Sequence, residues 1–157
     1  MKQALLEAER ALALGEVPVG AILVSGDDIL ARAYNLRETI KDPTAHAEIL
    51  ALKRAAMILG RWRLSDTTMY VTLEPCPMCA GALVQARVPV LVFGAMDPKA
   101  GAAGSVLNLV QSPALNHRME VIGGICEEEC QGLMDQFFAH LRDRGLRSEP
   151  SRSVKNV

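Results

Sequence analysis

The sequence is poor in aromatic side chains, which account for 4% of its 157 residues, and no apolar run approaches the ~20 residues that a membrane span requires. We therefore expect no membrane segment. Glu7, Glu9 and Arg10 interrupt residues 1–14, so this stretch predicts an amphipathic helix and not a signal peptide. Four cysteines are too few for a disulfide-stabilised scaffold, and we expect a cytoplasmic protein whose thiols are available to a metal.

An excess of charge of either sign is also missing, because the net charge is −1 and gives no overall attraction to nucleic acid. Residues 140–157 are an exception and hold more basic than acidic side chains. A positive tail is compatible with phosphate contacts, and charge alone fits a solvated helix end equally well. The composition is that of a globular protein. We expect one domain over residues 1–147 and a disordered tail over 148–157.

The hydrophobic pattern alternates between strand and helix periods from residue 67 onward, after an antiparallel hairpin. This order predicts a three-layer α/β/α sandwich around a mixed five-stranded sheet. Thr44 is the expected N-cap of one helix. The expected helices cover residues 2–14, 45–59, 77–87, 106–110 and 127–144, and the expected strands cover 18–24, 29–35, 67–73, 89–94 and 119–122.

Two thiols, Cys76 and Cys79, stand three residues apart directly after a strand pattern. Three residues is close to one helical turn, so both side chains would project from the same side of a helix start. Pro77 suits the first position of that helix, where no hydrogen bond is lost. The N–H groups of the first turn favour thiolates, which are ligands for a soft metal such as zinc. The spacing therefore predicts a metal site.

Upstream, His46 supplies a third candidate ligand and Glu48 a nearby carboxylate. Three protein ligands leave one tetrahedral position open, which is typical of catalytic zinc sites, where water occupies it. Two thiolates cancel the 2+ charge of the ion, so the ion acidifies its bound water less than an all-histidine site would. A base must therefore help to remove the proton from that water, and Glu48 is the candidate. Its offset of two positions from His46 suits a side chain that flanks the metal without binding it. The same carboxyl group could then deliver a proton to a leaving amine.

Each motif alone has an ordinary explanation. A Cys-x-x-Cys pair can be a redox motif or two packed thiols, and a His-x-Glu pair on a helix is usually surface decoration. Together, at two expected helix starts, they resemble the H-x-E…P-C-x-x-C signature of zinc-dependent nucleobase deaminases, with these same roles. The zinc motifs by themselves indicate only the wider cytidine-deaminase-like superfamily.

The flanking segments resemble, more narrowly, bacterial tRNA-specific adenosine deaminases of the TadA type, over about residues 3–145. The segments that carry the resemblance are GEVPVGA (15–21), DPTAHAE (42–48), YVTLEPCPMCA (70–80), GAAGS (101–105), NHR (116–118) and FF (137–138). The resemblance implies one Zn²⁺ per subunit, a homodimer, and hydrolytic deamination of adenosine to inosine at the wobble position of a tRNA anticodon. A splayed-out base in a single-stranded anticodon loop is a natural substrate for such a pocket.

The resemblance also assigns residues to the substrate. It implies that the base pocket is lined by one polar and two apolar side chains, that two further residues contact nucleotides beside the target, and that the final helix clasps the anticodon loop. The residues so assigned are Val19, Asn35 and Leu73 for the base, Asp97 and Lys99 for the flanking nucleotides, and Phe138 and Arg142 for the loop.

Without the resemblance, several of these residues have simpler explanations. Asn35 would be an ordinary turn residue at a strand end, and at least one phenylalanine of the pair at 137–138 is expected in the core. Cys126 and Cys130 are expected to be packed or surface thiols, since no histidine lies beside them. Met96 stands where some relatives carry arginine, which removes a phosphate contact and leaves the RNA footprint open.

Two other functions fit part of the pattern. A deaminase of a free base or nucleotide, of the guanine or cytosine type, would share the zinc site and differ at the pocket rim. A zinc-stabilised binding module, or an inactive partner subunit, would share the ligands but has no use for the unligated carboxylate of Glu48.

Overall fold

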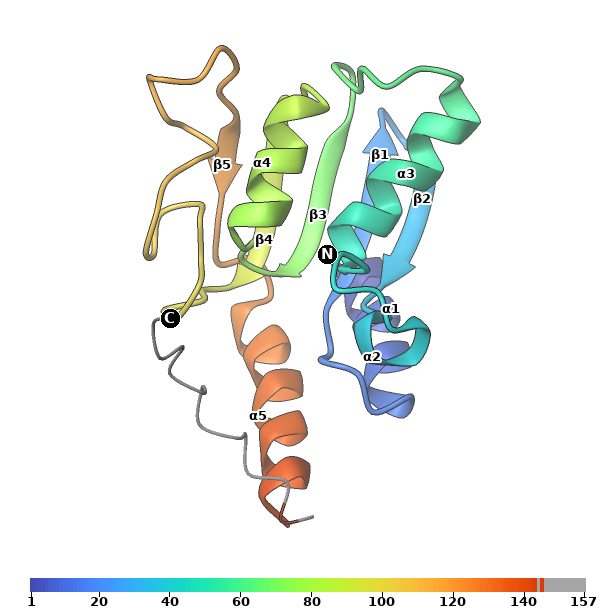
Figure 1. Ribbon diagram of the computed structural model, residues 1–157, viewed down its shortest axis with the longest axis vertical. Helices are drawn as coiled ribbons and strands as arrows, with labels where there is room; N and C mark the ends of the chain where they lie inside the picture. The colour runs from blue at the N-terminus through green and yellow to red at the C-terminus, as the bar shows by residue number, and fades with distance from the viewer. Residues whose placement is uncertain (144, 146–157) are drawn as a thin grey trace, which may run out of the picture.

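A computed structural model describes residues 1–143 and residue 145, and its centre is one five-stranded sheet (Figure 1). The expected tail over residues 148–157 lies outside the described residues. The strand order is β2-β1-β3-β4-β5, with β1 antiparallel to both β2 and β3, and with the remaining pairs parallel. The strands are β1 (Gly20–Ser25), β2 (Asp28–Tyr34), β3 (Thr68–Leu73), β4 (Val90–Ala95) and β5 (Glu120–Ile122).

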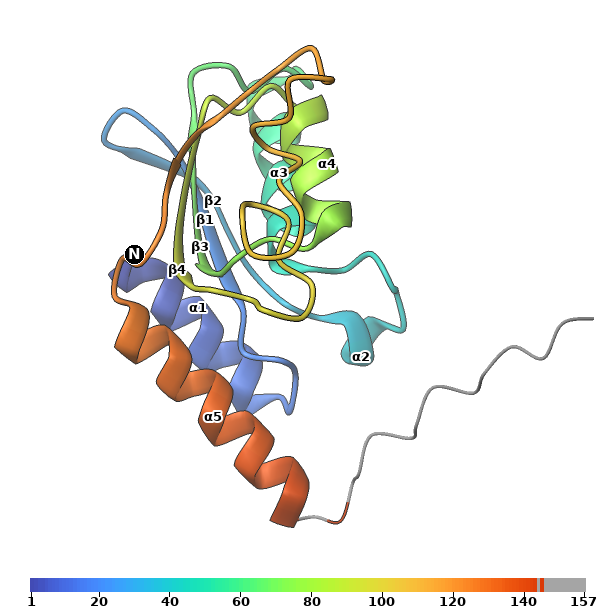
Figure 2. The same ribbon diagram turned by 90° about the vertical axis from the view of Figure 1, so that its left-hand side faces the viewer.

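Helices cover both faces of this sheet, as Figure 2 shows. Helices α3 and α4 lie on one face, and α1 and α5 lie side by side on the other. The expected α/β/α sandwich with a mixed sheet is therefore confirmed. The helices are α1 (Lys2–Ala13), α2 (Arg37–Ile40), α3 (Ala47–Leu59), α4 (Pro77–Gln85) and α5 (Glu127–Asp143).

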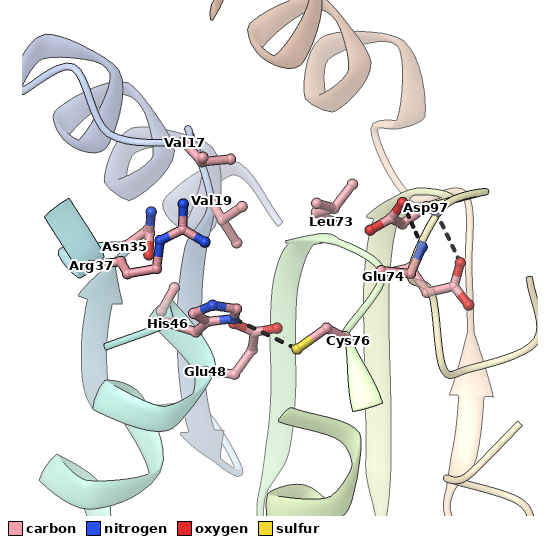
Figure 3. A pocket seen from close by; sticks show the side chains of 12 residues that line it. Val17, Val19, Asn35, Arg37, His46, Glu48, Leu73, Glu74, Cys76 and Asp97 are labelled. Carbon is pink, nitrogen blue, oxygen red and sulfur yellow. Dashed lines mark hydrogen bonds between the residues drawn. The ribbon is translucent and has the colours of Figure 1, made fainter. Parts of the chain in front are cut away.

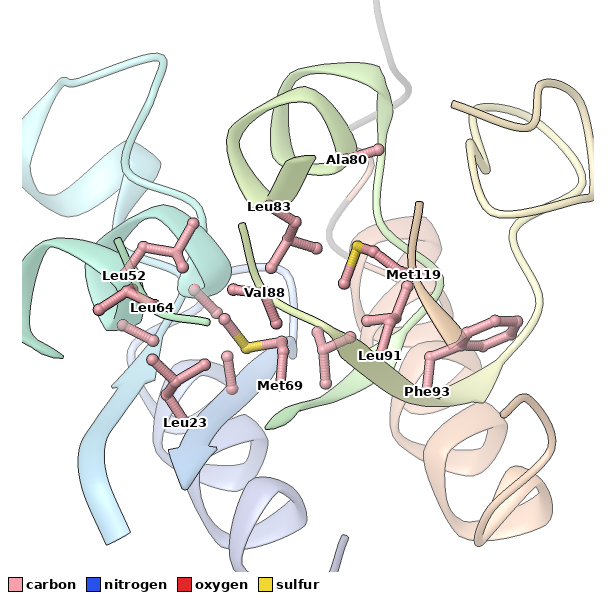
Figure 4. Close-up of a cluster of buried hydrophobic side chains, with 14 of the residues drawn as sticks. Leu23, Leu52, Leu64, Met69, Ala80, Leu83, Val88, Leu91, Phe93 and Met119 are labelled. Atoms are coloured by element: carbon pink, nitrogen blue, oxygen red, sulfur yellow. The ribbon is translucent and has the colours of Figure 1, made fainter. Parts of the chain in front are cut away.

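The larger core lies between the sheet and the α3/α4 layer (Figure 4). Leu23, Met69 and Leu91, from three neighbouring strands, and Leu83 from α4 have almost no exposed surface. Apolar burial of this kind stabilises a fold by about 25 cal/mol per Å² removed from water. This core fixes the two helices whose first residues carry the metal-binding motifs.

On the opposite face of the sheet, α5 packs closely against β4, and this contact buries the Cys130 side chain. That side chain is buried and lies against the backbone of β4 at Gly94. A Cβ atom at position 94 would overlap the Cys130 sulfur and lie 2.7 Å from Thr72 O, so only glycine allows α5 to approach the sheet this closely. The expectation of a packed thiol at position 130 agrees with this contact.

Three local expectations were wrong. Residues 106–110 form turns and one isolated bridge instead of a helix, because Val106 N and Leu107 N both donate to Gly101 O. Thr44 is not the N-cap of α3. Its N–H and hydroxyl donate to Asp42 Oδ1 at 2.8 and 2.7 Å in a turn before the helix. Finally, α2 forms a short helix inside a stretch that the sequence predicts to be loop.

Across residues 1–143, no helix combines the length and the hydrophobicity of a membrane span.

Candidate active site

The first residues of α3 and α4 bring together three side chains that could hold a metal ion. His46 is the N-cap of α3 and Cys76 is the N-cap of α4, each with extended backbone, and Cys79 lies in the first turn of α4. The Nδ1 atom of His46 is 3.6 Å from Cys76 Sγ and 3.5 Å from Cys79 Sγ. All three ligand atoms lie within 4.8 Å of one another. Segments 30 residues apart in the sequence thus share one point in space.

This donor set fits zinc. One imidazole nitrogen and two sulfurs are the ligands that zinc prefers. A tetrahedral zinc ion with bonds of about 2.0 Å to nitrogen and 2.3 Å to sulfur would hold these atoms about 3.5 Å apart. The observed separations of 3.5 and 3.6 Å agree with that value. Among the described residues, this trio is a group that could hold a metal ion.

The two thiols have very different proton affinities because they share one hydrogen bond. Donation from Cys79, together with the nearby His46, lowers the pKa of Cys76 to about 4. The same contact with Cys76, followed by burial, raises the pKa of Cys79 far above its ordinary value. The hydrogen bond with Cys76 also raises the pKa of His46. Binding of a metal by both sulfurs requires both thiols in the thiolate form, so the metal competes with protons for them.

Glu48 lies in the first turn of α3, one residue after the helix begins, and its side chain is buried. Figure 3 shows its carboxyl group directed toward the space between His46 and Cys76. Burial raises the pKa of Glu48 from its ordinary value of 4.5 to about 6. A carboxyl group that titrates near the operating pH can both take up and release a proton, as a general acid–base requires.

A cavity of about 190 Å³ is lined by His46, Cys76 and Glu48 (Figure 3). It is smaller than the ~300 Å³ and more of drug-sized sites, which suits a single base. Its lining combines apolar side chains with polar and charged ones. The lining residues are Val17, Val19, Asn35, Arg37, His46, Ala47, Glu48, Leu73, Glu74, Cys76, Asp97 and Ala100. The cavity thus unites most of the site residues that the sequence predicts. Cys79 is buried and does not line it.

One wall of the cavity depends on Glu16, a buried side chain from the segment after α1. Its Oε2 accepts a hydrogen bond from Asn35 Nδ2 at 3.2 Å. The carboxylate also accepts from the backbone N–H groups of Glu38 and Thr39, at 3.2 and 2.5 Å, in the first turn of α2. These bonds hold the short helix that carries Arg37 to the cavity wall.

The opposite wall depends on Glu74, which follows β3 and is also buried. Its carboxylate accepts three backbone hydrogen bonds at 3.0 Å, from Asp97, Ala103 and Ser105, and one from the Ser105 hydroxyl. Burial opposes ionisation, but these donors hold the pKa of Glu74 below its ordinary value. The segment that contains Asp97 is therefore hydrogen-bonded to the strand end that leads to Cys76.

A second hollow of about 410 Å³ adjoins the first and shares Val17, Leu73 and Asp97 with it. Lys99 and Phe138 lie in this hollow, with the lysine Nζ 5.8 Å from the ring centroid. Met96 also lines it and is 44% exposed, so an apolar side chain stands there. Arg142 is exposed in the last turn of α5 and lines neither hollow.

Sequence reasoning missed Glu16 and Glu74, although both stand inside the segments that carried the resemblance. The sequence did contain a signal for them, because each is a single acid within an otherwise apolar run. An acid in such a run is expected to be buried, and a buried carboxylate requires hydrogen-bond partners. Arg37 gave no such signal, because it follows a strand in a polar stretch.

Comparison with known proteins gives consistent matches. Residues 1–142 match a family described as MafB19-like deaminase. The chain is similar to a tRNA-specific adenosine deaminase of Bacillus subtilis, with 54% identity over 92% of this chain and 89% of that protein. It is also similar to a solved structure from work on A-to-I editing by tRNA:A34 deaminases, with a TM-score of 0.82 and 42% identity. That match covers 85% of this chain and 96% of the solved one.

A guanine deaminase of Bacillus subtilis is a more distant structural match. Its TM-score is 0.60 and its identity is 29%, with 94% of each chain covered. The core architecture is thus common to enzymes acting on free bases and on tRNA, while sequence similarity is greater to the tRNA-specific group.

Proposed function

The chain belongs to the tRNA-specific adenosine deaminase family, and from this premise we propose that it hydrolyses adenosine to inosine at the wobble position of a tRNA anticodon. The observation that carries the proposal is a base-sized cavity in which a metal-binding trio and a buried carboxylate lie together. The net reaction consumes one water and releases ammonia from carbon 6 of the purine.

We propose Zn²⁺, one per chain, held by His46, Cys76 and Cys79. Their donor atoms and separations fit that ion. When bound, zinc supplies a Lewis acid that makes a water molecule nucleophilic near neutral pH. The contribution of the chain itself is to fix the three donors at two helix starts, so that the ion has a defined place beside Glu48.

Glu48 moves the protons in this proposal. Its carboxylate takes a proton from the attacking water and later, as a carboxylic acid, gives one to the leaving amine. Both tasks require a group that changes protonation state in each cycle, and the raised pKa of about 6 supports that role. The buried position of Glu48 keeps bulk water from competing for the proton.

Val19, Leu73 and Asn35 are proposed to hold the target base. Val19 and Leu73 lie on opposite sides of the cavity and offer apolar surfaces to the two faces of a purine (Figure 3). Asn35 is the polar group of the wall, and its amide can pair with a base or ribose edge. A base can reach this depth only after it leaves the stack, which favours an anticodon loop over duplex RNA.

Nucleotides beside the target are proposed to lie over the second hollow. Asp97 and Lys99 line its rim, Phe138 supplies a stacking surface, and Arg142 lies further along α5 as a phosphate contact. Met96 adds an exposed apolar side chain to this hollow.

The direct test is to incubate the pure protein with an anticodon stem-loop RNA containing adenosine at the wobble position, and separately with free nucleosides and guanine. Inosine in the RNA supports the proposal. Activity on free bases alone would replace it with the free-base deaminase alternative. Glu48→Ala, which removes the carboxyl group, is expected to retain metal and to form no inosine.

We further propose a homodimer in the cytoplasm, built from a single domain over residues 1–147. Support for the dimer comes from an apolar hollow of about 360 Å³ between α3 and α4, where Trp62 is 61% exposed. Size-exclusion chromatography with light scattering tests the dimer. Trp62→Glu is expected to shift the protein toward monomer, because burying an unpaired carboxylate opposes association.

A further inference from the structure

Glu74 has a position that the chemistry of deamination does not require. It stands between β3 and the proposed metal ligand Cys76, yet within the described part of the chain its carboxylate accepts hydrogen bonds from the segment 97–105 alone. The residue is 2% exposed. A buried negative charge is tolerated only where donors surround it, and here backbone N–H groups supply most of them. An apolar residue in its place would leave those N–H groups without an acceptor.

The segment 97–105, which we call the rim loop, is folded around this carboxylate. Asp97 N donates to Oε2, while Ala103 N and Ser105 N donate to Oε1, so the two oxygens hold the two ends of the loop. A further bond, from Ala102 N to Pro75 O at 2.8 Å, ties the middle of the loop to the residue after Glu74. The loop is therefore bound to the end of β3 through Glu74 and Pro75, and backbone bonds at Ala102 and Gly104 join it to residues 109 and 107.

The rim loop carries groups of the proposed RNA site. Asp97 lines both hollows and Lys99 lines the second. Asp97 Oδ1 accepts hydrogen bonds from Lys99 N at 3.0 Å and from Ala100 N at 3.2 Å. The turn that carries Lys99 therefore begins at Asp97, and the N–H group of Asp97 is in turn bound to Glu74. A substitution of Glu74 is therefore expected to displace Asp97 and Lys99. Glu48 is expected to keep its position, because it lies on the separate helix α3.

We propose that Glu74 is a positioning residue for nucleotide recognition: its buried carboxylate anchors the rim loop so that Asp97 and Lys99 stay at the mouth of the cavity. This inference rests on the proposed RNA substrate. It assigns Glu74 no part in proton transfer and no bond to the metal.

The hydrogen-bond pattern predicts what Glu74→Gln does. The amide oxygen can keep the two N–H donors at the Oε1 position, from Ala103 and Ser105. The amide nitrogen then occupies the Oε2 position, where the Ser105 hydroxyl can turn to accept from it. Asp97 N–H, however, faces another N–H. The defect therefore concentrates at the start of the rim loop, and the rest of the loop keeps its bonds.

The experiment compares Glu74→Gln with Glu128→Gln, which removes the same charge from an exposed site on α5. On the wobble-adenosine stem-loop, Glu74→Gln is expected to raise KM about tenfold, the equivalent of one lost hydrogen bond, while kcat changes less than about twofold. Metal content is expected to stay at one ion per chain. Glu128→Gln is expected to match the wild type. A fall in kcat at unchanged KM would overturn the proposal.

A readout independent of activity separates this inference from the proposed function. Hydrogen exchange of the amides of residues 97–105 is expected to accelerate about tenfold in Glu74→Gln and to stay unchanged in Glu128→Gln. Equal exchange in all three proteins would overturn the anchoring role, even if the RNA is deaminated. If the wild type deaminates no RNA, the proposed function fails, while accelerated exchange would still establish the anchor.

Gly101→Ala tests the contact between Glu74 and the rim loop by changing the loop instead of the carboxylate. This variant tests the anchoring role of Glu74 if Glu74→Gln does not fold. A Cβ atom at position 101 would overlap the Glu74 carboxyl group and lie 2.6 Å from Asp97 O, so the rim loop must move away. The expected result is again a rise in KM with little change in kcat. Gly132→Ala is the matched control, because a Cβ atom there meets no atom within 4 Å. Equal KM values for the two alanine variants would contradict the proposal.

Discussion

Glu16 Oε2 accepts a hydrogen bond from Asn35 Nδ2 at 3.2 Å, and this contact fixes which way the asparagine amide points. A carboxylate can only accept, so it holds the NH₂ group of Asn35 and determines which amide atoms remain for the substrate. Both residues are buried, at 1% and 5% exposure, so water does not compete strongly for the bond. The polarity of the cavity at Asn35 is thus set by a residue that lines neither hollow.

We predict that Glu16→Gln weakens substrate binding and the fold together. The glutamine amide has one acceptor oxygen, and its NH₂ group must face either Asn35 Nδ2 or the backbone N–H groups of Glu38 and Thr39. In either orientation, at least one of these donors loses its acceptor. The expected cost is about 1–2 kcal/mol in unfolding free energy, with KM for the stem-loop raised about tenfold. Urea unfolding and steady-state kinetics measure the two effects. The exposed Glu9→Gln serves as control and is expected to change neither quantity by more than about 0.5 kcal/mol.

Glu48→Gln is predicted to abolish turnover and to stabilise the metal-free protein at neutral pH. Burial raises the pKa of Glu48 to about 6, above the 4.5 of the unfolded chain. The folded state therefore binds the extra proton, and stability falls as the pH rises from 4.5 to 6. Above pH 6 the buried charge costs about 2 kcal/mol, a cost that glutamine avoids.

Urea unfolding of the metal-free wild type and of Glu48→Gln at pH 4.5 and pH 7.5 measures this cost. The variant is expected to be more stable by about 2 kcal/mol at pH 7.5 and by well under 1 kcal/mol at pH 4.5. Equal stability at pH 7.5 would mean that the carboxylate is not held in a desolvated position.

His46→Ala is predicted to lose the metal, whereas His117→Ala keeps it. His46 supplies one of three donors, and the two remaining thiols hold zinc far less tightly. His117 lies on another segment, where Nε2 contacts Val88 O at 2.7 Å, and its loss is expected to cost about 1 kcal/mol of stability. Metal analysis after gel filtration gives the stoichiometry. A full complement of zinc in His46→Ala would refute the ligand set.

The two neighbouring phenylalanines of α5 are predicted to have separate roles. Phe137 is 8% exposed and Phe138 is 41% exposed, with ring centroids 5.5 Å apart in an edge-to-face contact. Phe137→Ala is expected to lower the unfolding free energy by about 3–4 kcal/mol, because it removes a buried aromatic ring. Phe138→Ala is expected to change stability by less than about 1 kcal/mol and to weaken stem-loop binding by 1–3 kcal/mol, as measured by fluorescence anisotropy. The reverse pattern would show that Phe138 is the packed ring.

Local patterns were sufficient to predict most elements of this fold. The expected helix over 45–59 ends at Leu59 as predicted, one residue before Gly60, and Pro77 begins α4. The continuous apolar run at 89–94 is β4, which has strands on both sides and is covered by helices on both faces. These features depend on residues close together in the sequence, which is why periodicity and capping predicted them.

Other features depend on contacts between distant segments. Residues 106–110 have an apolar pattern that favours a helix, but their N–H groups are bound to the carbonyls of Gly101 and Ala102. The strand order was also beyond local patterns, since β1 pairs with β3 across more than 40 residues. At the site, sequence motifs predicted the trio and Glu48, whereas Glu16 could be placed beside Asn35 only with coordinates.

The buried carboxylates of Glu16 and Glu74 lie in the cavity walls, apart from the proposed reaction centre. In the proposed function, metal ligation and proton transfer come from the starts of α3 and α4. The walls at residues 36–40 and 97–105 are hydrogen-bonded to the carboxylates of Glu16 and Glu74 in addition to backbone bonds. Loop libraries that keep Glu16 and Glu74 constant and vary exposed wall positions should therefore change which RNA enters without dismantling the reaction centre. The same separation would let substitutions in the walls change recognition while Glu48 stays in place.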